Sequence, residues 1–266
     1  MKYNRDIFYK LLVIFAFIAV WEIASRLEIV NPLFIPPFSS VILTLRNMFI
    51  SGNLAANIGI SVERALVGFI ISIIIGIPLG CLLGGWFSKV DLMAEPVIEI
   101  FSQVNPFILF HVLILFSGIG EIPKIVIIAW TCTWPIMFNT IYGIRHMDFS
   151  IIKTGRGFGL ERWKLFWKVG MPSILPSVFV GIRISGGYSF FMLIAAEMMG
   201  ASSGLGWLIL NNQENYAIKN IFAIAIIIAF LGLLMDTVIK FVENKLLGYK
   251  SEKMSNGINL NGGYNL

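Results

Sequence analysis

Long apolar runs without a charged residue recur along the chain between short charged segments. The clearest is Ala65–Phe87, which lies between Arg64 and Lys89 and holds no Asp, Glu, Lys or Arg. At a rise of about 1.5 Å per residue, a helix of this length crosses the roughly 30 Å hydrocarbon core of a bilayer. The pattern therefore predicts a transmembrane helix at this position.

Five further segments have a similar pattern, so the chain is predicted to cross a membrane six times. The short connection between the third and fourth segments predicts a hairpin. The segment nearest the N-terminus reaches spanning length only if Lys10 and Glu22 extend towards the interface; its alternative interpretation is the apolar core of a cleaved signal peptide. The six predicted spans are Ile7–Ala24, Ala65–Phe87, Ile100–Gly120, Ile125–Ile144, Pro172–Met199 and Ile221–Val242.

Glycines lie at intervals of four and eight residues on the second predicted span. Small residues on the face of this helix are Gly68, Gly76, Gly80, Gly84 and Gly85, so another helix can pack closely against it. Pro78 lies in the same span and is expected to kink it. The pattern predicts a helix packing face, with a gating hinge as the alternative.

The composition excludes a water-soluble protein. Of the 266 residues, 57% are hydrophobic and 13% are charged, with a mean hydropathy of +0.83, whereas soluble proteins carry roughly 25% charged residues. Both cysteines, Cys81 and Cys132, lie in apolar runs and are expected to be buried, inert thiols. The partner that this composition implies is a lipid bilayer.

Basic residues favour one orientation of the predicted spans. With both termini in the cytoplasm, fourteen Lys and Arg residues lie on the cytoplasmic side and five on the other side, as the positive-inside rule requires. The net charge of +5 is then explained by topology, and no motif for nucleic-acid binding accompanies it. We therefore expect a multi-pass membrane protein with both termini in the cytoplasm that binds no nucleic acid.

Polar residues within the spans are candidates for a translocation pathway. Gln103, Asn105 and His111 lie in the third span, where polar groups need partners or water. His111 has the alternative interpretation of a satisfied packing residue.

Two charged residues in the fifth span are further candidates. Arg183 lies about 13 Å along the helix from Ile174. It is expected either to pair with Glu99 or with a carbonyl at the cytoplasmic end of a helix, or to attract an anionic cargo. Glu197 lies near the outer end and is expected to be a surface or interfacial carboxylate, or to belong to an outer gate.

Motifs for catalysis and nucleotide binding are missing from the sequence. It holds no Gly-rich phosphate-binding loop, no HExxH and no metal-ligand spacing. We expect a non-catalytic membrane subunit without a bound cofactor or metal. An ion-coupled secondary carrier stays open as an alternative, although no inverted repeat supports it, and an integral-membrane enzyme would need a catalytic cluster that the sequence lacks.

The longest polar connection between spans covers residues 146–172. A short helix is predicted to begin at Asp148, followed by a turn at Gly157 and Gly159 and a second, amphipathic helix, Leu160–Val169, that ends before Pro172. One interpretation places this helix at the membrane interface, and the other makes it a docking element for a cytoplasmic partner.

This connection resembles the cytoplasmic EAA loop of permease subunits of bacterial ABC importers. The resemblance rests on Gly159, the aromatic and basic residues after it, and Pro172 followed by Ile174, Leu175 and Pro176. It extends from about Asn31 to Leu247 and points to the nitrate, sulfonate, taurine and bicarbonate branch. Other stretches that carry it are IPPFSSVILTL (residues 35–45), FSGIGEIPKI (116–125), GIRISGGYSF (181–190) and AAEMMGASSGLGWLILNNQ (195–213).

The resemblance implies a location in a bacterial or archaeal cytoplasmic (inner) membrane, an architecture and a set of partners. The fold is expected to be an all-α, MetI-like permease fold, with an N-terminal helix in residues 1–30, the permease domain in 31–247 and a disordered cytoplasmic tail in 248–266. Expected partners are a dimer of ATP-binding subunits that holds ATP-Mg, an extracytoplasmic solute-binding protein, which Glu197 is a candidate to contact, and a second permease copy, with a homodimer favoured over a heterodimer.

The function that the resemblance implies is the transport of a solute. The sequence also departs from the family motif in one place. The cargo is expected to be a small anion such as a sulfonate, taurine or nitrate, with a heterocyclic vitamin precursor as the alternative. Where the family has Glu-Ala-Ala, this chain has Lys153, Thr154 and Gly155, which reverses the charge offered to the ATPase. The candidate coupling residues are Lys153, Gly159, Leu160, Trp163, Lys164, Phe166 and Pro172.

Overall fold

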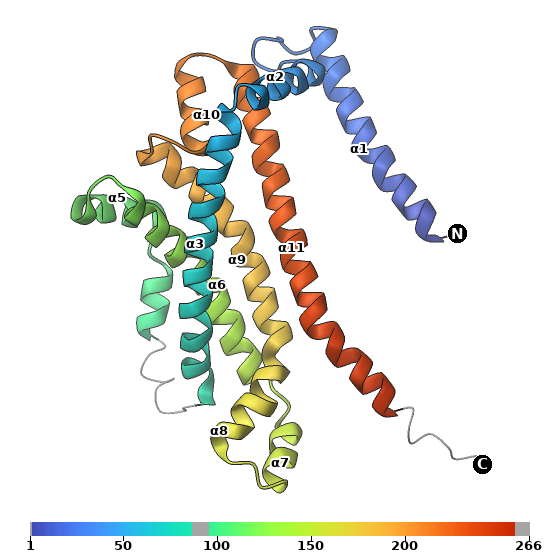
Figure 1. The fold of residues 1–266 in the computed structure, drawn as a ribbon, viewed down its shortest axis with the longest axis vertical. Coiled ribbons are helices and arrows are strands. Elements are labelled where there is room, and N and C mark those ends of the chain that lie inside the picture. The colour runs from blue at the N-terminus through green and yellow to red at the C-terminus, as the bar shows by residue number, and fades with distance from the viewer. Residues whose placement is uncertain (1, 87–95, 259–266) are drawn as a thin grey trace. The chain divides into compact units, whose positions relative to one another are not determined.

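The computed structural model describes residues 2–86 and 96–258, and every regular element in these ranges is a helix. Figure 1 shows long helices joined by short connections. The elements are α1 (Lys2–Arg26), α2 (Phe38–Ile50), α3 (Asn53–Cys81), the π-helix η1 (Leu82–Trp86), a helical segment Pro96–Ser102, α5 (Pro106–Ser117), α6 (Glu121–Arg145), α7 (Phe149–Gly157), α8 (Arg162–Leu165), the π-helix η2 (Phe166–Gly170), α9 (Met171–Gly200), α10 (Leu205–Glu214) and α11 (Ile218–Ile258). The predicted all-α class is confirmed.

The chain divides into two compact units. The first comprises Met1–Val62 and Glu197–Phe230, and the second comprises Glu63–Ala196 and Leu231–Leu266. Helices α3, α9 and α11 each contribute residues to both units.

Four of the predicted spans are found as helices long and apolar enough to cross a membrane. Among the described residues these are Asn53–Gly84, Glu121–Arg145, Trp163–Gly200 and Ile218–Leu247. The span predicted at Ile7–Ala24 falls on α1, where several side chains lie outside the described residues, so it stays a prediction. Residues 259–266 of the predicted tail also lie outside them. The helix α11 extends to Ile258.

The third predicted span, Ile100–Gly120, is not one straight helix. It consists of Pro96–Ser102 and α5, bent by 86° at a short break. Pro106 has no N–H and disfavours helical dihedral angles in the residue before it, and Asn105 is accordingly extended, with φ −65° and ψ 121°. The expectation of a continuous span is therefore wrong, and counting the bent pair as one span gives five spans in the described residues.

The glycine face of α3 packs directly against α6 in the second unit. A Cβ atom added to Gly68 would lie 2.7 Å from Ile128 Cγ2, and one added to Gly80 would lie 2.5 Å from Thr140 Cβ. Gly76 and Gly84 meet α6 in the same way. Such close approach increases dispersion contact between helices where the hydrophobic effect is absent, and the predicted packing face is confirmed.

Helix α9 packs on the same helix α6 through small residues. Gly181 lies against the backbone of Pro135, and the Ser185 hydroxyl donates to the Cys132 carbonyl at 2.7 Å. Cys132 and Cys81 are both buried, as predicted. Helix α6 is thus the element on which α3 and α9 both pack in the second unit.

We predict that Gly80→Ala destabilises the protein, because the new methyl group would lie 2.9 Å from the Met137 carbonyl oxygen on α6. Overpacking of this kind costs about 1–3 kcal/mol, which thermal unfolding in detergent micelles would register as a lower midpoint. The control is Gly187→Ala on α9, where a Cβ atom meets nothing within 4 Å. Equal midpoints for the two variants would contradict the close contact between α3 and α6.

Candidate functional site

The connection between α6 and α9 begins as the sequence predicts. Asp148 caps α7, and its carboxylate accepts a hydrogen bond from the Ser150 backbone N–H at 2.8 Å. This bond stabilises the charged form and lowers the pKa of the Asp148 carboxyl. The turn after α7 is at Gly159, whose φ of +72° is in the left-handed region that glycine adopts without steric cost.

The second helix of the connection differs from the prediction of a separate element ending before Pro172. Helix α8 continues through the π-helix η2 into α9, so that Trp163–Gly200 forms one helix of 38 residues. Proline has no N–H to donate, and the wider turn of a π-helix before it adjusts the hydrogen-bond pattern of the helix. Pro172 therefore lies within a continuous helix.

The aromatic residues of this segment face two directions. Trp163 is 63% exposed and Trp167 is 54% exposed, whereas Phe166 is only 8% exposed. Phe166 packs in a cluster with Cys81, Ile144 and two residues of α9, so it anchors the segment to its own chain. The exposed pair of tryptophans is the surface available to another molecule.

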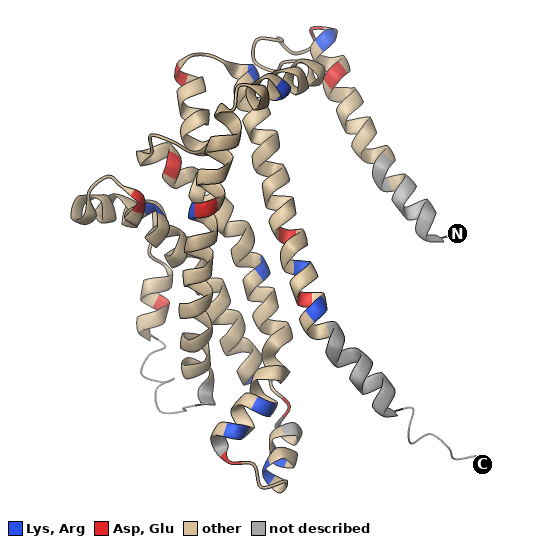
Figure 2. Cartoon of the chain, in the orientation of Figure 1, with Lys and Arg blue, Asp and Glu red and all other residues tan. Residues whose placement is uncertain are grey.

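Exposed basic residues lie on the two short helices of this connection. Lys153 on α7 and Lys164 on α8 are both exposed, and Lys164 lies 3.4 Å from the Glu161 carboxylate. Figure 2 shows Lys and Arg along α7 and α8. Leu160 is half-buried beside Gly155, which also contacts Leu165. We call the exposed Lys153, Trp163, Lys164 and Trp167 the coupling surface.

The polar residues predicted in the third span occupy three different settings. Asn105 caps α5 by accepting the Phe107 backbone N–H at 2.9 Å. The exposed His111 ring lies 2.8 Å from the Phe107 carbonyl oxygen through Nδ1. Gln103 is exposed and lines a cavity of about 350 Å³.

Arg183 forms an ionic cluster with α11. Its Nη2 pairs with the Glu243 carboxylate, and its Nε lies 3.9 Å from Asp236 Oδ1. Asp236 also pairs with Lys240. The expected ion pair is therefore present, but its partners are Glu243 and Asp236 rather than Glu99. Charges within spans need such compensation, because an isolated charge in hydrocarbon is costly.

Glu197 is fully buried, so the expectation of a surface carboxylate is wrong. The Ser61 hydroxyl lies 2.8 Å and 2.9 Å from its two carboxylate oxygens, and the Gly206 backbone N–H donates to Oε2 at 2.9 Å. These donors stabilise a carboxylate that is fully buried within the chain.

The Glu197 cluster holds the start of α10. The residue at the capping position of this helix has no side chain that could accept a hydrogen bond. The capping position is Gly204, with φ +112°. Instead, Asn57 Oδ1 accepts the Gly204 N–H at 2.6 Å, and the Ser61 hydroxyl oxygen accepts the Leu205 N–H at 2.8 Å. The first N–H groups of a helix need such acceptors, and here α3 and α9 supply them.

Sequence reasoning missed Asn57 and Ser61, although their spacing of four residues on an apolar helix was a usable signal. It also missed a second cluster, in which Arg64 and Lys124 both pair with Glu121. Arg64 Nη2 lies 2.7 Å and Lys124 Nζ lies 3.0 Å from Glu121 Oε1. Both cations are buried, and Glu121 is more exposed.

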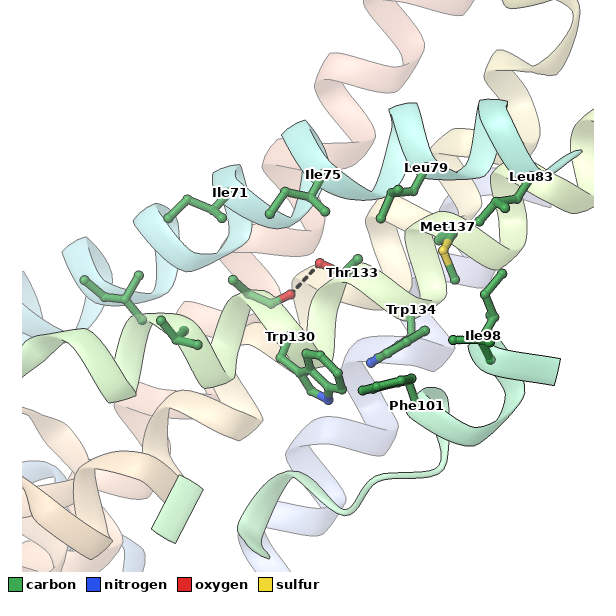
Figure 3. Close-up of a pocket in the computed structure, with 14 residues that line it drawn as sticks. Ile71, Ile75, Leu79, Leu83, Ile98, Phe101, Trp130, Thr133, Trp134 and Met137 are labelled. Carbon is green, nitrogen blue, oxygen red and sulfur yellow. Dashed lines mark hydrogen bonds between the residues drawn. The ribbon is translucent and has the colours of Figure 1, made fainter. Parts of the chain in front are cut away.

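An apolar cavity of about 500 Å³ lies in the second unit between α3, α6 and Pro96–Ser102 (Figure 3). Its wall includes the indole rings of Trp130 and Trp134. Among the described residues, no group of three or more His, Cys, Asp or Glu side chains could hold a metal ion.

Comparison with known proteins identifies the family. Residues 76–248 match the model of the binding-protein-dependent transport system inner membrane component, and the chain belongs to this family. It is 31% identical to SsuC of Bacillus subtilis over 88% of this chain and 84% of that protein, which is named as an aliphatic sulfonates transport permease. It is 26% identical to TauC of Escherichia coli, a taurine transport system permease, over 88% of this chain and 87% of that protein.

A third relative and a solved structure agree with this assignment. NrtB of Synechocystis, named as a nitrate import permease, is 28% identical over 76% of this chain and 74% of its own length. The fold is similar to that of a chain in an inward-facing structure of the MetNI methionine ABC transporter, with a TM-score of 0.64, 18% identity and coverage of 74% of this chain and 97% of that one. The predicted MetI-like fold is confirmed.

The protein is therefore a multi-pass permease subunit of an ATP-driven ABC importer, in the sulfonate, taurine and nitrate branch. Subunits of this class are the non-catalytic membrane component, and a partner ATPase hydrolyses ATP.

We predict that Glu197→Ala lowers the thermal unfolding midpoint by several degrees, because it leaves the Gly206 N–H and the Ser61 hydroxyl without their carboxylate acceptor. Loss of hydrogen bonds to a buried charged group costs about 1.5–3 kcal/mol. Glu214→Gln, at the exposed end of α10, is the matched control and should leave the midpoint unchanged. A stable Glu197→Ala variant would show that the cluster does not hold α10.

We predict that Arg183→Gln destabilises the protein, because it removes the cation paired with Glu243 and leaves Asp236 with Lys240 alone. The double variant Arg183→Gln with Glu243→Gln should recover most of the thermal stability. If the double variant is stable and imports its solute at the wild-type rate, Arg183 serves the ion cluster alone. If it is stable but has lost uptake, Arg183 acts on the cargo.

Proposed function

We propose that the chain forms, with a second copy of itself, the translocation pathway of an importer for a small anionic solute such as a sulfonate, taurine or nitrate. The relatives' names support this range of cargo. An extracytoplasmic solute-binding protein delivers the cargo, and the permease domain, residues 31–247, makes and breaks no covalent bond. The two permease halves alternate between inward and outward openings.

The ATPase docks on the coupling surface in this proposal. A dimer of ATP-binding subunits holds ATP-Mg, and a groove on each subunit receives Trp163 while Lys153 and Lys164 face acidic groups of that groove. Two large exposed aromatic side chains beside a basic rim have the composition of a protein–protein contact centre. Trp163, at 63% exposure, is the observation that carries the proposal.

The remaining candidate coupling residues position this surface rather than contact the ATPase. Phe166 is buried and fixes α8 to the core, and Gly159 turns the chain between α7 and α8. Leu160 packs beside α7, and Pro172 belongs to the continuous helix that leads from Trp163 into α9. A displacement of Trp163 is therefore passed directly to a spanning helix.

The proposed topology places the coupling surface and both termini in the cytoplasm, and the protein in the cytoplasmic membrane. The distribution of basic residues supports it. Gln103, His111, Arg183 and Glu197 are candidates for the pathway or its gates, while Asn105 serves the pathway indirectly by starting α5 at the bend.

We predict that Trp163→Ala uncouples transport. In proteoliposomes that contain the permease, the ATPase and the solute-binding protein, solute uptake should fall at least tenfold, and ATPase subunits should co-purify less with the permease, because interface tryptophans often contribute 2 kcal/mol or more, on the order of a 30-fold change in affinity. Tyr216→Ala is the matched control, since Tyr216 is 86% exposed in the connection after α10.

Two outcomes would contradict the proposal. One is wild-type uptake and co-purification of the Trp163→Ala variant. The other is solute uptake driven by an ion gradient in vesicles that hold this chain without an ATPase, which would indicate a secondary carrier.

A further inference from the structure

Four charged side chains form a patch on the side of the second unit where α9 and α11 pair. They are Arg183 on α9 and Asp236, Lys240 and Glu243 on α11, joined by the ion pairs described above. We call these four residues the ionic patch. Its formal charge is zero, since it holds two cations and two carboxylates. The side chains are not enclosed by their own chain: Arg183 is 39% exposed, Asp236 36% and Lys240 51%.

The ionic patch lies away from the ends of the spanning helices. Arg183 is about 18 Å from one end of α9 and about 25 Å from the other. Asp236 is about 27 Å and about 17 Å from the two ends of the spanning part of α11. Lys240 does not extend towards the nearer end, because its Nζ pairs with Asp236, one turn further inside. The patch is therefore at the depth of the hydrocarbon layer.

Acyl chains are an unfavourable neighbour for the ionic patch. Charged side chains within spans face protein or water rather than lipid, and the internal ion pairs leave a third or more of Arg183, Asp236 and Lys240 exposed. Helix α3 contrasts with this side, because residues 65–84 carry no charge, and Ile74 is 65% exposed. Lipid can cover the exposed side of α3, whereas the side that carries the ionic patch needs another cover.

We propose that the ionic patch faces a second copy of this chain across the translocation route. This inference rests on the proposed function and locates the contact between copies that it requires. A two-fold axis along the membrane normal keeps the depth of every residue and exchanges left and right. Arg183 lies on one helix of the patch and its carboxylate partners lie on the other. The guanidinium of one copy can therefore come opposite the carboxylates of the other copy.

The charge balance of the ionic patch supports a copy of itself as the occupant. A patch of one sign would repel its own copy, because like charges placed opposite each other across an interface are unfavourable. The ionic patch has equal numbers of both signs, separated onto two helices, so two copies can meet without a net repulsion. The copies then need no additional counter-ion at this depth.

Cross-linking of single cysteines in native membranes tests the contact. Leu233 lies three residues before Asp236, on the side of α11 that carries Lys240, and is 68% exposed. Val238 is 49% exposed, but it lies about 200° around the helix from Asp236. A short bifunctional maleimide should join two copies of the Leu233→Cys variant and should give no cross-linked pair with Val238→Cys.

Two further samples control this experiment. The wild-type chain is the blank, because both of its cysteines are buried and should give no cross-linked pair. Ile74→Cys on α3 places an exposed thiol on the side assigned to lipid, and it should also stay uncross-linked.

Reversal of one charge tests the balance of the patch. Lys240→Glu leaves one cation against three carboxylates in each copy. When two differently tagged copies are expressed together with the ATPase, recovery of the second tag should fall about tenfold. Lys245→Glu is the matched control, because Lys245 is exposed and lies about 180° around α11 from Asp236. Should Lys240→Glu fail to reach the membrane, the cross-linking result alone decides.

Three results would overturn the inference. These are equal cross-linking of Leu233→Cys and Val238→Cys, stronger cross-linking of Ile74→Cys than of Leu233→Cys, and labelling of Leu233→Cys by a photoactivatable lipid in the assembled importer. Recovery of both tags with ATP-dependent uptake would in each case leave the proposed function intact and place the contact elsewhere. Recovery of a single tag from a complex that imports its solute would contradict the pairing of two identical copies in the proposed function as well.

Discussion

The close contact of α3 with α6 is the interaction on which the second unit depends. In a bilayer, two apolar helices gain nothing from removing water, so they associate through dispersion contact, and that requires the backbones to approach. Glycine at Gly68, Gly76, Gly80 and Gly84 makes this approach possible along the whole seam. Because α9 packs on the same α6, this contact fixes the frame from which the coupling segment extends.

Lipid also limits where the chain can bend. Backbone groups must be satisfied inside the hydrocarbon layer, so breaks occur where side chains or wider turns compensate. Asn105 supplies an acceptor at the 86° bend, and η2 precedes Pro172 without interrupting the helix. At the start of α10, Asn57, Ser61 and Glu197 provide the acceptors. Each irregularity is thus accompanied by side-chain acceptors or by a wider helical turn.

The sequence predicted the features that depend on local pattern. Uncharged length identified four spans, glycine spacing identified the packing face of α3, and Asp148 and Gly159 marked the start and the turn of the coupling connection. The bend at Asn105 and Pro106 was also readable, because a capping residue followed by proline signals a helix start. The segment was nevertheless predicted as one continuous span, because its uncharged run is long enough to cross a bilayer.

The sequence pattern could not predict which residues pair when they are far apart in the chain. Ser61 and Glu197 are 136 residues apart in sequence, and neither local sequence indicates its partner. Arg183 could be expected to need a carboxylate, but the choice of Glu243 over Glu99 depends on which helices pack together. The burial of Phe166 beside the exposed Trp163 could not be predicted for the same reason. Helical periodicity indicates an apolar face but not which part of the chain packs against it.

The unbroken helix from Trp163 to Gly200 has a mechanical consequence. A loop between a docking element and a spanning helix would absorb part of any movement as slack, whereas a helix transmits rotation about its own axis as well as translation. A small rotation of the helix end that carries Trp163 and Trp167 would thus reorient the side chains further along the same helix. A small movement of the ATPase would then be sufficient to change which side chains of this helix line the translocation pathway.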